Sequence, residues 1–139
     1  AITTDVLCGF PGETDEEHRE TMDFVEKVGF ARIHVFPYSR RSGTLADTMP
    51  GQVDQAVKNK RAAQLIELGN RLENIFVQSL VGSIQQVLFE ECVEDGLCEG
   101  YTGQYVRVRA HARPGEICMV RIASAQGVSA QGEVVEGGI

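Results

Sequence analysis

The sequence has few cysteines, and they are not closely paired. Its four cysteines are scattered over 139 residues, and no two of them form a C-x-x-C pair. Zinc ribbons and dithiol redox motifs need such pairs, so neither kind of site is indicated. We expect all four side chains to be reduced thiols, as is usual in the cytoplasm: Cys8, Cys92, Cys98 and Cys118.

Long apolar runs are also missing. No stretch reaches the ~18 consecutive apolar residues that a membrane-spanning helix needs, so we expect no membrane association. No basic segment followed by an apolar one opens the chain, and we therefore expect a cytoplasmic protein rather than an exported one.

Positive charge is scarce, above all in the second half of the chain. The formal net charge is −7, and no lysine follows Lys60. Residues 80–139 contain 4 arginines against 8 acidic side chains. Because attraction to phosphate depends on Lys and Arg, this balance argues against a free-standing nucleic-acid-binding protein. Any RNA contact in this half has to depend on a local patch of arginines.

The chain opens with a predicted strand and a glycine-rich turn. Residues 2–8 are mostly apolar and predict a strand that is buried on both faces. The turn Gly9-Phe-Pro-Gly12 follows directly and carries backbone N–H groups past the carboxyl end of that strand. Open α/β sheets and barrels bind their ligands at this end. A plain strand-to-helix connection is the alternative explanation for the two glycines.

A capped helix and a second strand complete this unit. Thr14 and Glu17 have the spacing of a capping box, which predicts the start of a helix that ends at Gly29. Residues 31–36 then alternate as a strand. A strand–helix–strand run of this length predicts a right-handed parallel crossover.

A loop over residues 37–51 and a long helix come next. Apolar residues recur at helical spacing from Val53 to Phe76, and Gly69 weakens the prediction of an unbroken helix. We expect the charged residues of this helix to lie on its solvent side: Lys58, Lys60, Arg61, Glu67, Arg71 and Glu73.

From about residue 80 the pattern changes to short strands. Turn residues recur at Asp95-Gly96, Thr102-Gly103, Pro114-Gly115 and Gln126-Gly127. Short strands at such regular spacing are typical of a small closed antiparallel barrel. The predicted fold class is therefore an α/β part followed by an all-β part.

Four stretches together resemble one enzyme family. Residues 4–14 (TDVLCGFPGET) resemble a late barrel strand and turn of radical S-adenosylmethionine enzymes. Residues 36–44 (FPYSRRSGT) and 49–53 (MPGQV) resemble the methylthiotransferase branch of those enzymes. The last 60 residues are similar to its C-terminal TRAM domain, a small OB-like barrel that binds RNA. Arg40-Arg41 together with residues 49–53 resembles the sequences of the subgroup that acts on threonylcarbamoyladenosine in tRNA.

The resemblance implies a division into three parts. Residues 1–45 would be the C-terminal part of a partial radical S-adenosylmethionine barrel, residues 46–79 a helical connector, and residues 80–139 the TRAM barrel. The family uses S-adenosylmethionine and two 4Fe-4S clusters, one of them bound by a C-x-x-x-C-x-x-C loop that this sequence lacks. We therefore expect the chain to be the C-terminal piece of a larger enzyme, to have no catalytic residues, metal site or bound cofactor, and to be inactive alone.

The resemblance also implies site residues in the first part. The wall of the S-adenosylmethionine site is assigned to Gly9, Pro11, Gly12, Glu13, Phe36, Pro37 and Tyr38. Glu13 either accepts backbone N–H groups there or only favours the helix terminus. Arg40 and Arg41 suit a carboxylate of cofactor or substrate, and a solvated loop is the alternative.

In the barrel, tyrosines and arginines combine stacking with phosphate binding. We assign RNA binding to Tyr101, Tyr105, Arg107, Arg109 and Arg121, with Tyr105, Arg107 and Arg109 on one face of one strand. The acidic residues should lie away from RNA: Glu90, Glu91, Glu94, Asp95 and Glu99.

The expected partner is the anticodon stem-loop of tRNA. Relatives that act on isopentenyladenosine or on a ribosomal protein are alternatives, as is a non-catalytic RNA-binding module. The exposed strand edge at the start of the chain also suggests a homodimer or a disordered N-terminal part.

Overall fold

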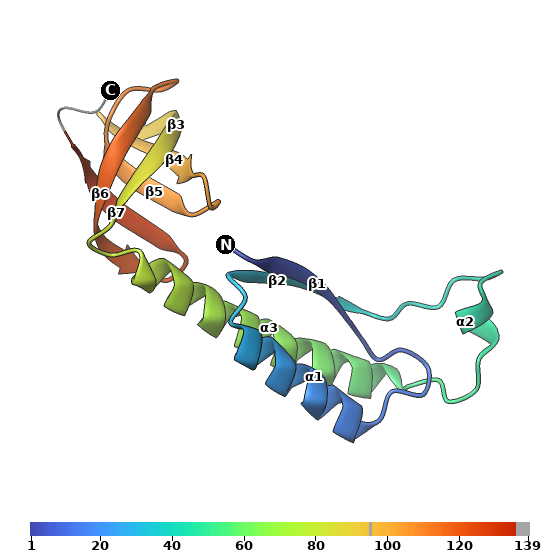
Figure 1. Ribbon diagram of the computed structural model, residues 1–139. Helices are drawn as coiled ribbons and strands as arrows, with labels where there is room; N and C mark the ends of the chain where they lie inside the picture. The colour runs from blue at the N-terminus through green and yellow to red at the C-terminus, as the bar shows by residue number, and fades with distance from the viewer. Residues whose placement is uncertain (95, 136–139) are drawn as a thin grey trace. The chain divides into compact units, whose positions relative to one another are not determined.

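The computed structural model describes residues 1–94 and 96–135 (Figure 1). It divides into two compact units, Ala1–Leu72 and Glu73–Ile139. Asp95, predicted to lie in a turn, is outside the described residues. Within those residues, no helix is both long enough and apolar enough to cross a lipid bilayer.

The first unit is built on two parallel strands. Strand β1 (Thr3–Cys8) leads to helix α1 (Asp15–Val28), and strand β2 (Arg32–Pro37) returns beside β1, with Leu7 opposite Phe36. This confirms the predicted parallel pairing. A short helix, α2 (Leu45–Thr48), and the long helix α3 (Gln55–Ser79) follow. Because α3 runs through the division at Leu72, the predicted connector is shared between the two units.

The start of α1 has the predicted capping box. The Thr14 hydroxyl accepts the Glu17 backbone N–H at 3.1 Å, and the Glu17 carboxylate accepts the Thr14 N–H at 2.8 Å. The helix ends at Gly29, whose φ of 68° is a left-handed conformation that glycine adopts without strain.

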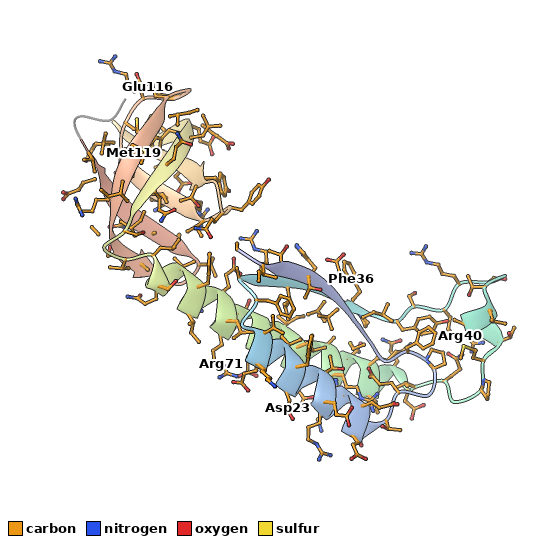
Figure 2. The ribbon with its side chains drawn as sticks, in the orientation of Figure 1. Asp23, Phe36, Arg40, Arg71, Glu116 and Met119 are labelled. Atoms are coloured by element: carbon orange, nitrogen blue, oxygen red, sulfur yellow. A yellow bond between two sulfur atoms is a disulfide. The ribbon has the colours of Figure 1, made fainter. Side chains whose placement is uncertain are left out.

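Helices α1 and α3 cover only one face of the β1–β2 pair. Buried side chains from α1, α3 and the covered strand face form one core: Cys8, Val25, Leu65, Leu68 and Leu72. On the other face, Leu7 and Phe36 are half exposed, and Figure 2 shows Phe36 pointing away from the two helices. The prediction that β1 is buried on both faces is therefore wrong, because a single helical layer packs against it.

Gly69 has a packing role and does not break α3. The helix is continuous from Gln55, two residues after the predicted start, and a Cβ at Gly69 would lie 2.6 Å from the Ile33 side chain. The glycine therefore lets α3 approach β2 closely.

The second unit contains a closed barrel. Its strands are β3 (Ile84–Glu94), β4 (Leu97–Thr102), β5 (Arg107–His111), β6 (Ile117–Gln126) and β7 (Ser129–Val134), in the order β3-β4-β5-β7-β6. The closed barrel was predicted, but the all-antiparallel pairing was wrong, because β5 and β7 are parallel, with Arg107 opposite Ser129. A ring of five strands cannot alternate in direction throughout, so one parallel pair is unavoidable.

Alternating residues of these strands fill the barrel. The largest of the fully buried side chains there are Val87, Phe89, Cys98, Val108, Val120 and Ile122. Val77 and Leu80 join this core from the end of α3 and the turn that follows it.

One pair of cysteines is oxidised. Cys92 and Cys98 lie opposite each other on β3 and β4 and form a disulfide, whereas Cys8 and Cys118 are free thiols. The expectation of four reduced thiols is therefore wrong for this pair. The six-residue separation has no meaning as a sequence motif, but the β3–β4 hairpin brings the two side chains together.

Candidate functional site

The turn after β1 uses its own backbone amides. The N–H of Gly9 donates to Glu13 Oε1 at 2.9 Å, that of Gly12 to the Gly51 carbonyl at 2.8 Å, and that of Glu13 to the Phe10 carbonyl at 2.9 Å. These three groups are therefore not available to a ligand. The turn contributes the path of its backbone, which depends on the positive φ angles of Gly9 (72°) and Gly12 (87°).

Two buried cations of α3 hold this turn, contrary to the expectation that they face solvent. Arg61 is 5% exposed and donates to Glu13 Oε1 at 2.7 Å and to Asp15 Oδ1 at 2.8 Å. Lys58 is also buried, and its ammonium donates to the Tyr38 carbonyl at 3.1 Å. The helical pattern alone could not locate them, because their partners come from distant segments.

These contacts shift three pKa values. The hydrogen bond from Arg61 and its charge lower the pKa of Asp15. Burial opposes ionisation of Arg61 itself, but the hydrogen bonds to Asp15 and Glu13 outweigh it and raise its pKa. Burial, helped by the charge of Glu13, raises the pKa of the Cys8 thiol. The turn is thus held by an internal network of ion pairs. The neighbouring Cys8 thiol favours its neutral form.

A pocket lies where β1 and β2 end. It has a volume of about 470 Å³ and is lined by Leu7, Phe36, Pro37, Tyr38, Ser39, Arg41, Thr44 and Ala46. Apolar side chains with a few polar groups are typical of a site for a small molecule. Tyr38 Oη is buried and has no hydrogen-bond partner among the described residues, so a bound polar group could satisfy it.

Six of the seven predicted wall residues, all except Gly9, divide between two pockets. Phe36, Pro37 and Tyr38 line the pocket at the strand ends, whereas Pro11, Gly12 and Glu13 line another, of about 590 Å³. The second pocket also contains the carboxylates of Glu17 and Glu20. Its lining is therefore more acidic than that of the pocket at the strand ends.

The paired arginines differ in their surroundings. Arg40 donates through Nε to Asp47 Oδ1 at 2.9 Å and through Nη2 to the Asp47 carbonyl at 2.7 Å, beside α2 (Figure 2). Arg41 lines the pocket at the strand ends, and no carboxylate in the described part of the chain pairs with it. Arg41 is therefore better placed than Arg40 to bind a carboxylate of a ligand.

The barrel arginines are close to an acidic residue. Arg109 pairs with Glu99 across β4 and β5, and Arg107 lies 3.9 Å from the same carboxylate. Glu99 was expected to lie away from RNA, but the β4–β5 register places it directly opposite Arg109, one of the arginines assigned to RNA binding. Arg121 is on β6, opposite Ile84 of β3.

Tyr105 is not on the strand to which it was assigned. It lies in the turn between β4 and β5, with a φ of 61°, and is 74% exposed. Tyr101, on β4, lies opposite Leu88 on one side and Arg107 on the other. A groove of about 520 Å³ brings the two tyrosines together with Gln86, Leu88, Glu90, Thr102, Gly103 and Ile117.

The sequence prediction did not include Leu88 and Ile117. Both carry large apolar side chains that are about half exposed beside the tyrosines. Their alternation along β3 and β6 is a signal that could have identified them.

The described residues do not supply the group of cysteine thiolates that an iron–sulfur cluster requires. Cys92 and Cys98 are joined, and the described residues contain no group of three or more His, Cys, Asp or Glu side chains that could hold a metal ion. The residues present therefore do not fit a cluster.

Comparison with curated proteins finds similar sequences over most of the chain, although no family model matches it. The threonylcarbamoyladenosine tRNA methylthiotransferase MtaB of Bacillus subtilis is 41% identical over 112 residues, 78% of this chain. A tRNA-2-methylthio-N(6)-dimethylallyladenosine synthase of Thermoanaerobacter sp. is 40% identical over 98% of the chain. The ribosomal protein uS12 methylthiotransferase RimO of Clostridioides difficile is 32% identical over 96%.

The aligned region is only part of each relative. It spans 25% of the Bacillus protein, 30% of the Thermoanaerobacter protein and 32% of the Clostridioides protein.

Proposed function

Because this chain belongs to the radical S-adenosylmethionine methylthiotransferase family, we propose that it is the C-terminal part of an enzyme that adds a 2-methylthio group to threonylcarbamoyladenosine beside the tRNA anticodon. The observation that carries the reaction class is the similarity of nearly the whole chain to enzymes named for methylthio transfer. Arg41 in the pocket at the strand ends supports the choice of base, because the threonylcarbamoyl group carries a carboxylate.

The pocket at the strand ends fits one side of an S-adenosylmethionine site. Phe36, Pro37 and Tyr38 would flank the adenine, and Arg41 would bind a carboxylate of cofactor or substrate. When bound, the cofactor supplies the radical chemistry. The turn with Gly9, Pro11, Gly12 and Glu13 would support this wall from behind, since its amides are already hydrogen-bonded.

The groove of the barrel would hold RNA. Exposed Tyr101 and Tyr105 provide rings on which unpaired bases can stack, and Arg107 lies beside Tyr101 to meet a phosphate. Arg109 and Arg121 would extend the contact. Arg109 contributes less than its charge suggests, because Glu99 competes with phosphate for it.

Three other functions are alternatives, and observations support two of them. The relatives include enzymes named for dimethylallyladenosine and for ribosomal protein uS12. The second would bring a basic protein to the barrel, and the excess of acidic residues after residue 80 favours it. An RNA-binding module without catalysis is the remaining alternative.

Mass spectrometry of tRNA nucleosides and of ribosomal protein uS12 separates these functions. Cells without the gene should lose 2-methylthio-threonylcarbamoyladenosine from tRNA and regain it when the gene is restored. Loss of the dimethylallyl derivative, or an unmethylthiolated uS12 with unchanged tRNA, would replace the proposed substrate by the corresponding alternative. If neither methylthiolated nucleoside changed and the methylthiolation of uS12 was also unchanged, the result would contradict the enzyme class.

A further inference from the structure

Arg61 bridges two separate parts of the turn after β1. One nitrogen, Nη1, donates to Glu13 Oε1 and to the Glu13 carbonyl, at 2.7 and 3.0 Å. The other, Nη2, donates to Asp15 Oδ1 in the first turn of α1. A guanidinium can bind in this forked way, and an ammonium cannot.

The oxygen that Arg61 binds also orders the turn. Glu13 Oε1 accepts the backbone N–H of Gly9 at 2.9 Å, so Arg61 and Gly9 share one acceptor. The side chains of Arg61 and Glu13 are only 6% and 14% exposed. Removing the cation would leave a nearly buried carboxylate without compensation, and the carboxylate would turn toward water and release Gly9.

Lys58 connects the same turn to the end of β2. Its side chain occupies the space in which a Cβ of Gly9 would lie, only 2.3 Å from Lys58 Cγ. Its ammonium donates to the Tyr38 carbonyl and lies 5.7 Å from the centre of the Tyr38 ring. Phe10, in the turn, contacts that ring edge-on at 5.4 Å. A displacement of the turn is therefore transmitted to Tyr38, which lines the pocket at the strand ends.

We propose that Arg61 is a positioning residue for the pocket at the strand ends, acting through Glu13 and the Gly9–Glu13 turn on Phe10 and Tyr38. Lys58 is its partner in this role. The ligand class, an adenine-containing cofactor, rests on the proposed function. The positioning itself rests only on the contacts of the first unit.

The first test follows the turn by amide hydrogen exchange in the 139-residue chain. Arg61→Gln should speed exchange at Gly9 at least about tenfold while exchange at Leu65 of α3 changes much less. Lys60→Gln, an exposed neighbour on the same helix, is the matched control and should leave Gly9 unchanged. The double variant Glu13→Gln/Arg61→Gln removes both charges and should recover part of the Gly9 protection, because the amide oxygen at position 13 can still accept the Gly9 N–H without a buried unpaired charge. Equal acceleration at Gly9 and Leu65 in Arg61→Gln would show a merely structural role.

The second test measures S-adenosylmethionine binding to the full-length, cluster-loaded enzyme by equilibrium dialysis. Arg61→Gln should raise the dissociation constant about tenfold to a hundredfold, and Arg61→Lys should recover only part of that loss. Lys60→Gln should bind like the wild type. Unchanged binding in Arg61→Gln would overturn the positioning role and leave the proposed function intact. A wild-type enzyme that does not bind the cofactor would overturn the proposed function and the ligand class together, whatever the exchange experiment shows.

Discussion

The two units differ in how completely they bury their sheets. The barrel of the second unit closes on itself, and Val87, Phe89, Val108 and Val120 inside it are fully buried. In the first unit, helices cover one face of the β1–β2 pair and leave Leu7 and Phe36 half exposed on the other. The barrel therefore has the features of a self-sufficient fold, whereas the first unit presents an open apolar face beside its candidate pocket. The predicted homodimer through this unit stays a prediction.

The largest effect should come from the barrel core. Phe89→Ala should lower the free energy of unfolding of the second unit by about 3–5 kcal/mol, because it removes a completely buried ring. Urea denaturation followed by circular dichroism measures the loss. Phe24→Ala, at a position 61% exposed on α1, is the control and should change stability by less than about 0.5 kcal/mol. Similar losses in both variants would contradict the closed core.

A single added methyl group should also destabilise the barrel, but less than the loss of the Phe89 ring. A Cβ at Gly100 would lie 2.1 Å from the Leu88 carbonyl oxygen, so Gly100→Ala should cost about 1–3 kcal/mol as β3 and β4 are forced apart. Gly103 has no atom within 4 Å of its Cβ position, so Gly103→Ala should be nearly neutral. Thermal melting of the two variants makes the comparison. Equal melting temperatures would show that β3 and β4 are less closely paired at Gly100.

A moderate effect is expected on RNA affinity. Glu99→Gln should strengthen binding of an anticodon stem-loop about two- to fivefold, because Arg107 and Arg109 lose a competing carboxylate. Filter binding at several salt concentrations should also show a steeper salt dependence. Glu116→Gln makes the same change of charge at an exposed position (Figure 2) and should have less effect. If both variants gain RNA affinity equally, the net charge of the chain limits binding, and the Glu99 contacts do not.

The smallest effect should be a pH dependence confined to the first unit. Burial and Glu13 raise the pKa of Cys8 in the folded chain, so the fold favours the neutral thiol. This stabilisation is complete below the unfolded thiol pKa of about 8.5 and is lost as pH rises through the folded value. Urea midpoints for the first unit should therefore fall as the pH rises above about 8.5. Cys8→Ala should remove this fall and Cys118→Ala should keep it; the opposite pattern would assign the titration to Cys118.

The parts that the sequence predicted correctly depend on neighbours along the chain. The capping box of Thr14 and Glu17 needs a spacing of three residues, and the left-handed end at Gly29 needs one glycine. The closed barrel was recognisable because turn residues recur at regular intervals from Asp95 to Gly127. Each of these signals is local, so a single sequence is enough to read it.

The errors concern pairs of residues that only the folded chain brings together. Arg61 was placed in solvent because its helix position is compatible with exposure, and Glu13, 48 residues away, buries it. Arg40 was grouped with Arg41, and Asp47 separates their roles. Glu99 was placed away from RNA, but it contacts two of the arginines assigned to RNA binding.

The sequence by itself determined the family, the first strand–helix–strand unit, the long helix and the closed barrel, because periodicity, capping residues and turn residues act over a few positions; it did not predict α2, which lies in the expected loop. The tertiary structure decided which charged side chains are buried, which cysteines pair, and which arginine is available in the pocket. Those outcomes depend on the distance between residues far apart in the chain, and register and packing set that distance.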